Sequence, residues 1–542
     1  MAEPKENLQM EKIVSLCKRR GFVFQSSEIY GGLNGFWDYG PLGAELKRNV
    51  KELWWNTMTR QRDDIAGLEA TIIMSPKIWE ASGHVATFSD PMIDCKTCKG
   101  RFRADQTDEI ACPQKPSKCV NECHGEKTEA RAFNLMFQTY VGPTATAADM
   151  AYLRPETAQA IFAQFKNVME TARQKVPFGI AQVGKAFRNE VTPRNFTFRS
   201  REFEQMELEF FIKPDEVIEA IHGNVAKVHE TGHPGEPQSN WGWEAWHRYW
   251  VEERVRFYEG IGLTRATLGF HHQTPTDLAH YARACTDILF KFPFSKKDAD
   301  GNVTGDELEG IAARSDFDLS QHQRFSGKPM GVFDEELRAA WAKLPKEKSD
   351  ELWKRYYEHS KNYLTKSAKP DEPPEQISQQ ATEDANGLAK GQYIPHVIEP
   401  SAGVDRLILA LIANAYSEVT KTDDKGKSET TVVMKFHPRV APVKVGVFPL
   451  LKNKPELVAK AQAVYELLRP HLKAVYDDGG SIGKRYARQD EAGTPFCVTV
   501  DFDTLGEKPE LLDTVTIRHR DDGKQERLKI SELLAFLLSK IR

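Results

Sequence analysis

Two charged residues with the spacing of one strand face lie in the segment Phe187-Arg188-Asn189-Glu190. Side chains at positions i and i+2 of a strand project from the same face, so Arg188 and Glu190 can act on one ligand. A guanidinium pairs with phosphate oxygens, and a carboxylate accepts hydrogen bonds from an amino group such as that of adenine. Taken alone, this spacing is more typical of a surface salt bridge. A loop rich in arginine follows it, with Arg194, Arg199 and Arg201.

A second chemical motif is the segment Glu399-Pro-Ser401-Ala-Gly403-Val-Asp-Arg406, which leads into the apolar run 407–413. The pattern predicts a strand end and a glycine turn that open a helix with Arg406 in its first turn. A cation at that end is mildly unfavourable for the helix dipole, which favours an anionic partner. On its own the segment is as typical of a capping turn.

Two further motifs match only in part. The run 179–185 has P-loop spacing, but Ala186 stands where Ser or Thr would hold Mg²⁺, and the spacer has the pattern of a strand. The run 229–233 matches H-E-x-x-H, but Gly232 and Pro234 end the helix that both imidazoles need. We assign neither a nucleotide loop nor a catalytic zinc site here.

Five of the eight cysteines lie between Cys95 and Cys123. The spacing C-x2-C followed by C-x3-C is similar to a zinc ribbon, and in a reducing compartment it favours metal over disulfides. We expect a structural Zn²⁺ ion, with a degenerate ribbon that holds no metal as the alternative. Cys112 and His124 lie nearby, so the fourth ligand is ambiguous. The predicted ligands are Cys95, Cys98, Cys119 and Cys123.

A basic segment near the C-terminus interleaves charges with an aromatic ring. Lys484, Arg485 and Arg488 surround Tyr486 in this segment. Such a pattern suits single-stranded RNA, through stacking and phosphate contacts, although a solvated charge run is the commoner explanation. His519 and Arg520 are additional candidates.

Length and composition restrict the class of protein. The chain has 542 residues, enough for about three or four domains, and a net charge of −4, which gives no overall attraction to nucleic acid. The first twenty residues carry charges throughout, and no apolar run reaches membrane-spanning length. We therefore expect a cytoplasmic protein without a membrane segment.

The elements that position these motifs can be read from periodicity. We expect strands over 180–183, 206–211 and 308–312, a low-hydrophobicity linker over 367–392, and a C-terminal unit with the order strand, helix, strand, strand, helix. The remaining predicted helices cover residues 8–20, 46–54, 241–258, 404–415, 455–475 and 530–541.

Together and in this order, the two motifs resemble motifs 2 and 3 of the class II aminoacyl-tRNA synthetases, F-R-x-E and G-x-x-R before a helix. Residues 72–84 look like motif 1, a dimer-forming strand with its proline at Pro76. Further phrases resemble the dimeric, glycine-specific members of the class: GFWDYGPLG, SGHV, YLRPETAQ, REFEQMELE, ELEGIAARSDFDL, VIEPSAGVDR and GKRYARQDEAGTPFCVTVD. The resemblance covers nearly the whole chain.

This resemblance implies an α+β fold, in which an antiparallel sheet flanked by helices precedes a mixed α/β anticodon-binding domain. It divides the chain into a catalytic domain (1–440), a Cys-rich insertion (92–132), a polar loop (296–306), a helical or linker insertion (320–392) and an anticodon-binding domain (441–542). The implied reaction activates glycine with ATP and Mg²⁺ and transfers it to tRNA(Gly). A homodimer is expected.

The resemblance also implies roles for individual residues. Arg188 and Arg406 are the catalytic arginines, on the α- and γ-phosphates, and either Glu307 or Glu309 holds Mg²⁺. The implied ATP site consists of Arg188, Asn189, Glu190, Phe198, Arg199, Phe203, Glu307, Glu309 and Arg406. The implied glycine site consists of Arg154, Glu156, Glu207, Arg314, Glu399 and Ser401.

Two rival functions stay open at this point. One is a class II ligase for another amino acid, against which the acidic residues and the glycine-type phrases count. The other is a relative that binds nucleic acid without activating an amino acid. That relative is expected to have lost Arg188, Glu190 or Arg406, and all three are present.

Overall fold

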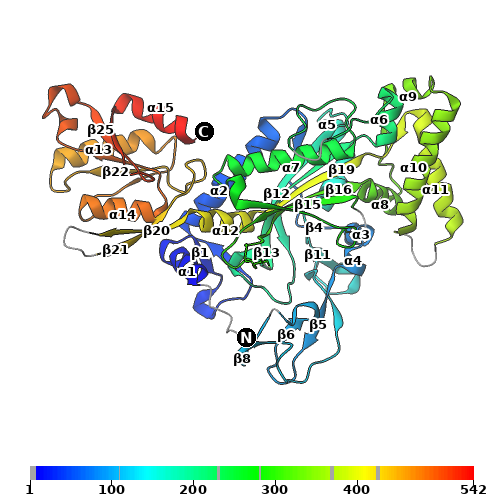
Figure 1. Ribbon diagram of the computed structural model, residues 1–542, viewed down its shortest axis with the longest axis horizontal. Coiled ribbons are helices and arrows are strands. Elements are labelled where there is room, and N and C mark those ends of the chain that lie inside the picture. The colour runs from blue at the N-terminus through cyan, green and yellow to red at the C-terminus, as the bar shows by residue number, and fades with distance from the viewer. Residues whose placement is uncertain are drawn as a thin grey trace.

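A central sheet with helices on both faces forms the middle of the molecule, a helical unit lies at one end, and a C-terminal α/β unit lies at the other (Figure 1). The structure is a computed structural model that describes residues 8–108, 110–228, 232–279, 282–298, 300–366, 372–422 and 428–541. None of the helices in these ranges has the length and apolar character needed to cross a membrane.

The central sheet has seven strands in the order β14-β15-β16-β19-β13-β12-β3. Every neighbouring pair is antiparallel except β12 and β3, so the predicted antiparallel sheet is confirmed. Its strands are β3 (Ile65–Gly67), β12 (Phe178–Phe187), β13 (Glu202–Ile212), β14 (Leu268–His272), β15 (Ala284–Phe290), β16 (Asp306–Ser315) and β19 (His396–Gly403).

Alternate residues of β13 separate the two faces of this sheet. Phe210 packs against Trp246 and Trp250, with ring centroids 4.9 and 5.2 Å apart, and so faces helix α7 (Trp243–Glu259). Phe211 packs at 4.4 Å against Phe165 of helix α5 (Ala158–Thr171) on the opposite face. Helices α2 (Pro41–Trp55) and α12 (Val404–Ala415) share the core of the α7 face. By the same alternation Gln205, Glu207 and Glu209 lie on the α5 face, whereas Glu204 lies on the α7 face and pairs with Lys47 and Lys51 of α2.

Residues 72–84 differ from the expected motif 1 strand. Only β4 (Ile73–Met74) is extended, and it pairs with β11 (Met150–Leu153) of a separate three-stranded sheet that also contains β10 (Gln138–Tyr140). Pro76 begins helix α3 (Pro76–Ala81) instead of interrupting a strand. Proline suits this first helical position, because its missing N–H would have no intrahelical partner there.

The helical unit consists of α8 (Phe317–Ser326), α9 (Glu335–Trp341), α10 (Lys346–Lys366) and α11 (Pro374–Gly387). The segment 367–392, predicted as a low-hydrophobicity linker or insertion, contains the helix α11, so the helical alternative holds for this part of the insertion. Ile377, Ala381 and Ala385 recur at intervals of four and are buried, which gives this polar helix a narrow apolar stripe. Residues 367–371 of the predicted linker lie outside the described ranges.

The Cys-rich segment forms small hairpins that project from the central part of the molecule (Figure 1). Strands β5 (Ser89–Asp94), β6 (Arg101–Arg103) and β9 (Arg131–Asn134) form one sheet, and β7 (Ala111–Cys112) pairs with β8 (Lys115–Cys119). Ile93, Phe102 and Val120 give this segment a core of its own.

The C-terminal unit is a five-stranded mixed sheet of order β23-β22-β24-β25-β26. The predicted order of elements is confirmed, but β23, α14 and β26 were not predicted, nor was the preceding hairpin of β20 (Tyr416–Thr422) and β21 (Ser428–Met434). Its elements are β22 (Val445–Pro449), α13 (Pro455–Leu468), β23 (Ala474–Tyr476), α14 (Ile482–Ala492), β24 (Phe496–Val500), β25 (Thr514–His519), β26 (Gln525–Lys529) and α15 (Ile530–Ile541).

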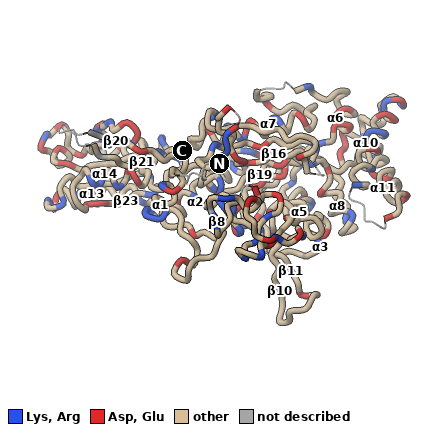
Figure 2. The backbone as a smooth tube through the Cα atoms, turned by 60° about the horizontal axis from the view of Figure 1, so that its bottom comes forward, with Lys and Arg blue, Asp and Glu red and all other residues tan. Residues whose placement is uncertain are grey.

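Shorter elements complete the chain: α1 (Leu8–Arg20), β1 (Val23–Gln25), β2 (Trp37–Tyr39), α4 (His84–Thr87), α6 (Asp215–His222), β17 (Val332–Phe333) and β18 (Gln392–Tyr393). The predicted N-terminal helix is confirmed by α1. Acidic and basic residues are interspersed along the whole chain, as Figure 2 shows. This mixing is consistent with the small net charge.

Candidate active site

A polar cavity of about 160 Å³ lies on the α5 face of the central sheet, where β12, β13 and the start of α12 meet. Most of the residues predicted for a nucleotide line it: Arg188, Glu190, Phe198, Arg199, Phe203, Glu307 and Arg406. The two sequence motifs, more than 200 residues apart, therefore contribute to one site. Asn189 does not line the cavity, and its backbone N–H donates to the carbonyl of Leu135 at 2.7 Å.

Arg188 is held in place by its surroundings. Its Nε donates to the carbonyl of Pro155 at 3.0 Å. The guanidinium carbon lies 5.4 Å from the ring centre of Phe88 and 5.5 Å from that of Phe203. These aromatic contacts and the hydrogen bond to a backbone carbonyl fix the orientation of the guanidinium group, whose charge faces the cavity.

Arg406 lies across the cavity in the first turn of α12. Its Nε donates to the carbonyl of Phe198 at 3.3 Å, and its guanidinium lies 4.7 Å from the Phe198 ring centre. The anionic partner expected for this cation is present as Glu307, whose carboxylate lies 3.3 Å from Nη1. A phosphate group could compete for the same guanidinium.

Three buried polar atoms of residues that line the cavity have no hydrogen-bond partner among the described residues. They are Oε2 of Glu190, Nη1 of Arg199 and Oε1 of Gln205. Leaving such atoms unpaired is costly, so the site suits a ligand that brings both a donor and an acceptor. A nucleotide, with its amino and phosphate groups, meets this requirement.

Glu309 is a wrong candidate for this site. It is 1% exposed and bonds to Arg254 Nε at 2.7 Å and to the hydroxyl of Tyr258, both on α7. The pairing of β15 with β16 shifts by one residue between Glu307 and Glu309, so Leu308 is an extra residue. This bulge places the two glutamates on opposite faces of the sheet, and only Glu307 lies in the cavity.

An acidic pocket adjoins the cavity, with Glu207 of β13 at its centre. The Oε1 atom of Glu207 accepts from Ser401 Oγ at 2.6 Å and from Gln205 Nε2 at 2.7 Å. The Oε2 atom accepts from the backbone N–H of Thr157 at 3.0 Å. Burial raises the pKa of Glu207, and the nearby charge of Glu156 raises it further.

Glu399 forms the second wall of the acidic pocket. Both of its oxygens lie 2.9 Å from Nη1 of Arg314, whose other nitrogens bind Asp318 at 2.8 and 3.0 Å. Burial outweighs this ion pair and raises the pKa of Glu399 to about 7. The group is therefore poised to ionise fully when a cation enters.

Glu156 forms the third wall and ionises more readily. It accepts from Gln159 Nε2 at 3.0 Å, and its other oxygen lies 3.4 Å from His84 Nε2. Burial acts to raise the pKa of Glu156, but His84, Arg314 and Arg188 outweigh it and hold the pKa well below its usual range. Three converging carboxylates favour a small cationic ligand such as an ammonium group.

Glu209 belongs to the same acidic group and was missed by the sequence analysis. It follows Glu207 on the same face of β13, is fully buried, and has no hydrogen-bond partner for either oxygen within the described part of the chain. Burial, and then the charge of Glu399, raises the pKa of Glu209 well above its usual value. The alternation of β13 is the signal that could have identified it.

Arg154 lies behind the pocket rather than at its edge. It is 3% exposed, and its guanidinium donates to the carbonyls of Lys185 at 2.7 Å and Ala70 at 3.1 Å. These bonds tie the segment before α5 to β12 and so position Glu156, two residues further on. Direct contact with a ligand, as predicted for Arg154, is not what this geometry favours.

Among the cysteine thiols, the contact that the structure shows involves Cys112, which was not among the four predicted ligands. The Sγ atoms of Cys112 and Cys123 are 3.3 Å apart. Burial raises the pKa of Cys98, and the thiols of Cys95 and Cys112 raise it further. Within the described ranges, no contact joins the Cys119 thiol to this group. The contact with Cys123 makes Cys112 a further candidate ligand beside the predicted four, but no three of the described thiols lie within 4.8 Å of one another, so the structure does not define a four-thiol set.

The basic segment of the C-terminal unit is only partly available to RNA. Arg485 is 1% exposed and donates to the carbonyls of Pro449, Asp478 and Gly480, so its predicted RNA contact is wrong. Arg520 is likewise buried and bonds to two carbonyls. On α14, Lys484 is exposed and Arg488 is half-buried beside Asp477, with which it pairs at 2.6 Å.

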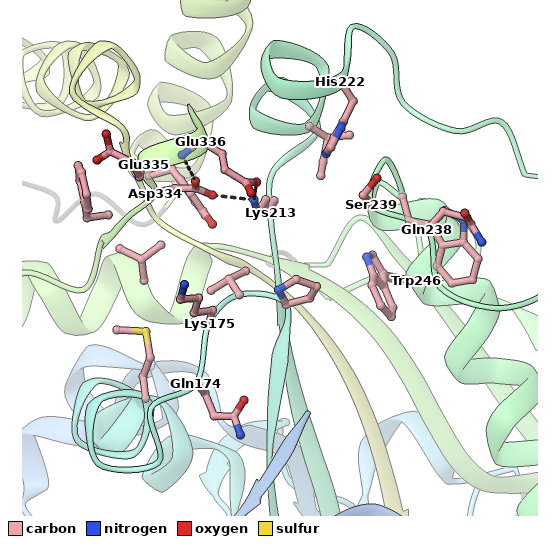
Figure 3. A pocket seen from close by; sticks show the side chains of 18 residues that line it. Gln174, Lys175, Lys213, His222, Gln238, Ser239, Trp246, Asp334, Glu335 and Glu336 are labelled. Atoms are coloured by element: carbon pink, nitrogen blue, oxygen red, sulfur yellow. Dashed lines mark hydrogen bonds and ion pairs between the residues drawn. The ribbon is translucent and has the colours of Figure 1, made fainter. Parts of the chain in front are cut away.

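Of the two partial motifs, the described part of the chain decides only the first. Residues 179–185 lie within β12, which confirms that they form a strand and not a phosphate loop. His229, Glu230 and Thr231 of the H-E-x-x-H match lie outside the described ranges. A larger cavity of about 700 Å³ between α5, α6 and α9 contains the ion pair of Lys213 and Asp334, 2.7 Å apart, but none of the predicted site residues (Figure 3).

Comparison with known proteins agrees with this geometry. A family described as "tRNA synthetase class II core domain (G, H, P, S and T)" matches residues 144–231, and one described as "Anticodon binding domain" matches residues 444–540. Glycine–tRNA ligase from Treponema denticola is 42% identical over 99% of this chain and 98% of its own length. The glycine–tRNA ligases of Streptomyces coelicolor and Thermus thermophilus are 40% and 41% identical, over 98% of this chain in each case. The aligned region covers 98% of the Streptomyces coelicolor protein and 99% of the Thermus thermophilus protein.

Proposed function

This chain belongs to the glycine–tRNA ligase family, and we propose that its acidic pocket holds glycine while the adjoining cavity holds ATP. The chain is a class II ligase that uses ATP and a divalent metal to attach glycine to tRNA(Gly). The observation that carries the residue assignment is the convergence of Glu156, Glu207 and Glu399 beside a cavity that contains Arg188 and Arg406.

Glycine offers only an ammonium and a carboxylate as handles, since it has no side chain. The ammonium binds among Glu156, Glu207 and Glu399, with Ser401 holding Glu207 in place. The carboxylate then points toward the cavity, where it attacks the α-phosphorus of ATP and pyrophosphate leaves. A larger amino acid is rejected because its side chain would have to enter a pocket that buried, mutually bonded side chains already fill.

In the cavity, Arg188 binds the α-phosphate and stabilises the charge that develops during attack, while Arg406 binds the γ-phosphate. Glu190 accepts a hydrogen bond from the adenine amino group through its unpaired Oε2. Phe198 and Phe203 support the two arginines. Phosphoryl chemistry of this kind depends mainly on positioning and on neutralising charge.

The proposal extends to the metals and partners. Mg²⁺ on the phosphates would neutralise their charge, and Glu307 is the carboxylate placed to hold it. A structural Zn²⁺ would be held by Cys95, Cys98, Cys112 and Cys123, with no position open for catalysis. The exposed side of α14 contacts the anticodon through Lys484 and Arg488. We also propose that the protein works as a homodimer in the cytoplasm.

Amino-acid-dependent exchange of pyrophosphate into ATP, without tRNA, tests the site assignment. Wild-type protein should exchange with glycine alone. Glu207→Gln should raise the KM for glycine by roughly thirtyfold or more, because a buried charged hydrogen bond is lost, and should leave the KM for ATP unchanged. Equal effects on both KM values, or none, would place glycine elsewhere.

A further inference from the structure

A buried polar cluster lies behind the acidic pocket, where α10 crosses the ends of β16 and β19. His359 of α10 donates from Nε2 to Asp316 Oδ1 at 3.0 Å, and its Nδ1 lies 2.6 Å from Arg283 Nη2. The ring of His396, the first residue of β19, lies 5.0 Å from that of His359. Asp316 and His396 are buried, and the exposed fraction of the His359 side chain is 13%.

This cluster has some features of a metal site, but its hydrogen bonds oppose one. The potential ligand atoms of Asp316, His359 and His396 lie within 4.8 Å of one another. Arg283 can only donate, so Nδ1 of His359 must accept, and the proton of the neutral ring is then on Nε2. A protonated Nε2 cannot bind a metal, and the guanidinium repels a cation. The hydrogen bonds of His359 therefore form a bridge between α10 and the chain after β16. His396 is not part of this bridge, because neither of its ring nitrogens has a hydrogen-bond partner among the described residues.

The bridge acts on a strained corner of the chain. Ser315 has a φ of 60°, in the left-handed region that non-glycine residues avoid, and the pairing of β16 with β19 shifts just before it. Ser315 Oγ donates to Tyr363 of α10 at 3.0 Å, and Asp316 also accepts from Ser320 of α8 at 3.0 Å. Helix α10 thus contacts both residues of the corner.

The same corner carries the arginine of the acidic pocket. Arg314 immediately precedes Ser315 and connects Glu399 to Asp318 through four hydrogen bonds of 2.8 to 3.0 Å. Asp318 in turn accepts from Gln159 at 2.9 Å, and Gln159 bonds to Glu156. A rotation of the corner would therefore disturb two walls of the pocket together.

We propose that His359 is a positioning residue for glycine binding: by holding Asp316, it fixes the corner that aims Arg314 at Glu399. This inference rests on the proposed role of the acidic pocket. It gives the helical insertion a function, because α10 supplies the bracing side chains from a segment more than 40 residues away from Arg314 in sequence. Since His359 lies behind the pocket, it acts only through the corner.

The test measures pyrophosphate exchange with the full chain at varied glycine and at varied ATP. His359→Leu keeps bulk but removes the donor to Asp316, and it should raise the KM for glycine roughly tenfold while the KM for ATP stays within about twofold. In His359→Gln the amide can still donate to Asp316, so the KM for glycine should stay close to that of the wild type. Glu358→Gln, at the exposed neighbouring position of α10, is the matched control.

A double-mutant cycle separates this role from general destabilisation. If His359 acts through Asp316, combining His359→Leu with Asp316→Asn should cost no more than the larger single effect. Additive effects, equal shifts in both KM values, or a loss of thermal stability without a change in the KM for glycine would overturn the inference. Glu399→Gln in the same assay tests the proposed pocket separately. If Glu399→Gln raises the KM for glycine and His359→Leu does not, only the role of His359 fails.

Discussion

Glu307 and Glu309 lie on opposite faces of β16, although residues two apart in a regular strand share a face. Leu308 is an extra residue in the pairing with β15, so the alternation is reset between them. Glu307 lines the cavity proposed to hold ATP and is half exposed, whereas Glu309 is buried against α7 in a bond with Arg254. One inserted residue thus separates a ligand-facing carboxylate from a structural one.

Substitution of the two glutamates should have opposite consequences. Glu309→Gln leaves the Arg254 charge without its partner and should lower the free energy of unfolding by about 3 kcal/mol. Glu307→Gln removes an exposed ion pair and should leave stability unchanged, while lowering the rate of glycine-dependent pyrophosphate exchange. Urea denaturation measures the stability of both variants, and pyrophosphate exchange measures the activity of both. Normal exchange by Glu307→Gln would remove it from the site.

The pH dependence of glycine binding should follow the ionisation of Glu399. Burial raises the pKa of Glu399 to about 7, against the pull of Arg314, so its carboxylate becomes charged as the pH rises through that value. If only the ionised form binds the ammonium, the KM for glycine should fall about tenfold from about pH 6 to about pH 8. Measuring the KM for glycine between about pH 6 and about pH 8 checks both the direction and the size of this change.

Two variants make this profile specific to Glu399. Glu399→Gln should raise the KM for glycine and flatten its pH dependence. His84 contacts Glu156, another wall of the pocket, so His84→Gln serves as the control and should keep the slope. If the pH dependence of the KM for glycine survives in Glu399→Gln and disappears in His84→Gln, it does not arise from Glu399, and this prediction fails.

The identity of the fourth zinc ligand can be settled by metal content. Cys112 lies 3.3 Å from Cys123, so Cys112→Ser should abolish stoichiometric zinc, whereas Cys119→Ser should retain it. The protein is expressed in medium with added zinc, and its metal content is measured by mass spectrometry after gel filtration. Zinc loss in Cys119→Ser alone would restore the set predicted from spacing, and zinc-free wild type would identify a degenerate ribbon.

The sequence sufficed for those parts of the fold and site that depend on local pattern. The strand before Arg188 and the apolar helix after Arg406 could be placed, because a period of two or 3.6 residues decides which side chains share a face. The acidic residues Glu207 and Glu399 were implied by the family resemblance and not by periodicity. The sequence left helix and linker open over 374–387, because the apolar stripe of this helix is narrow and its remaining residues are typical of linkers.

Other features depended on long-range geometry that no local pattern contains. Spacing alone could not separate Glu307 from Glu309, because the bulge at Leu308 depends on a partner strand. Arg485 looked like an RNA contact because a charged side chain in a basic run is usually solvated. Here it bonds to carbonyls at the end of β22 and in the loop before α14, and only the packed unit shows that they are near.

The two basic residues of α14 should therefore separate RNA binding from folding. Lys484 is exposed, so Lys484→Ala should weaken tRNA binding severalfold and reduce the salt dependence of that binding by about one unit of slope. Glycine-dependent exchange without tRNA should be unaffected. Arg485→Ala leaves buried carbonyls unpaired and should lower the unfolding midpoint instead. Lys540→Ala, at an exposed position of α15, is the control for non-specific charge effects. If Lys484→Ala and Lys540→Ala change tRNA affinity equally, α14 is not the RNA-binding face.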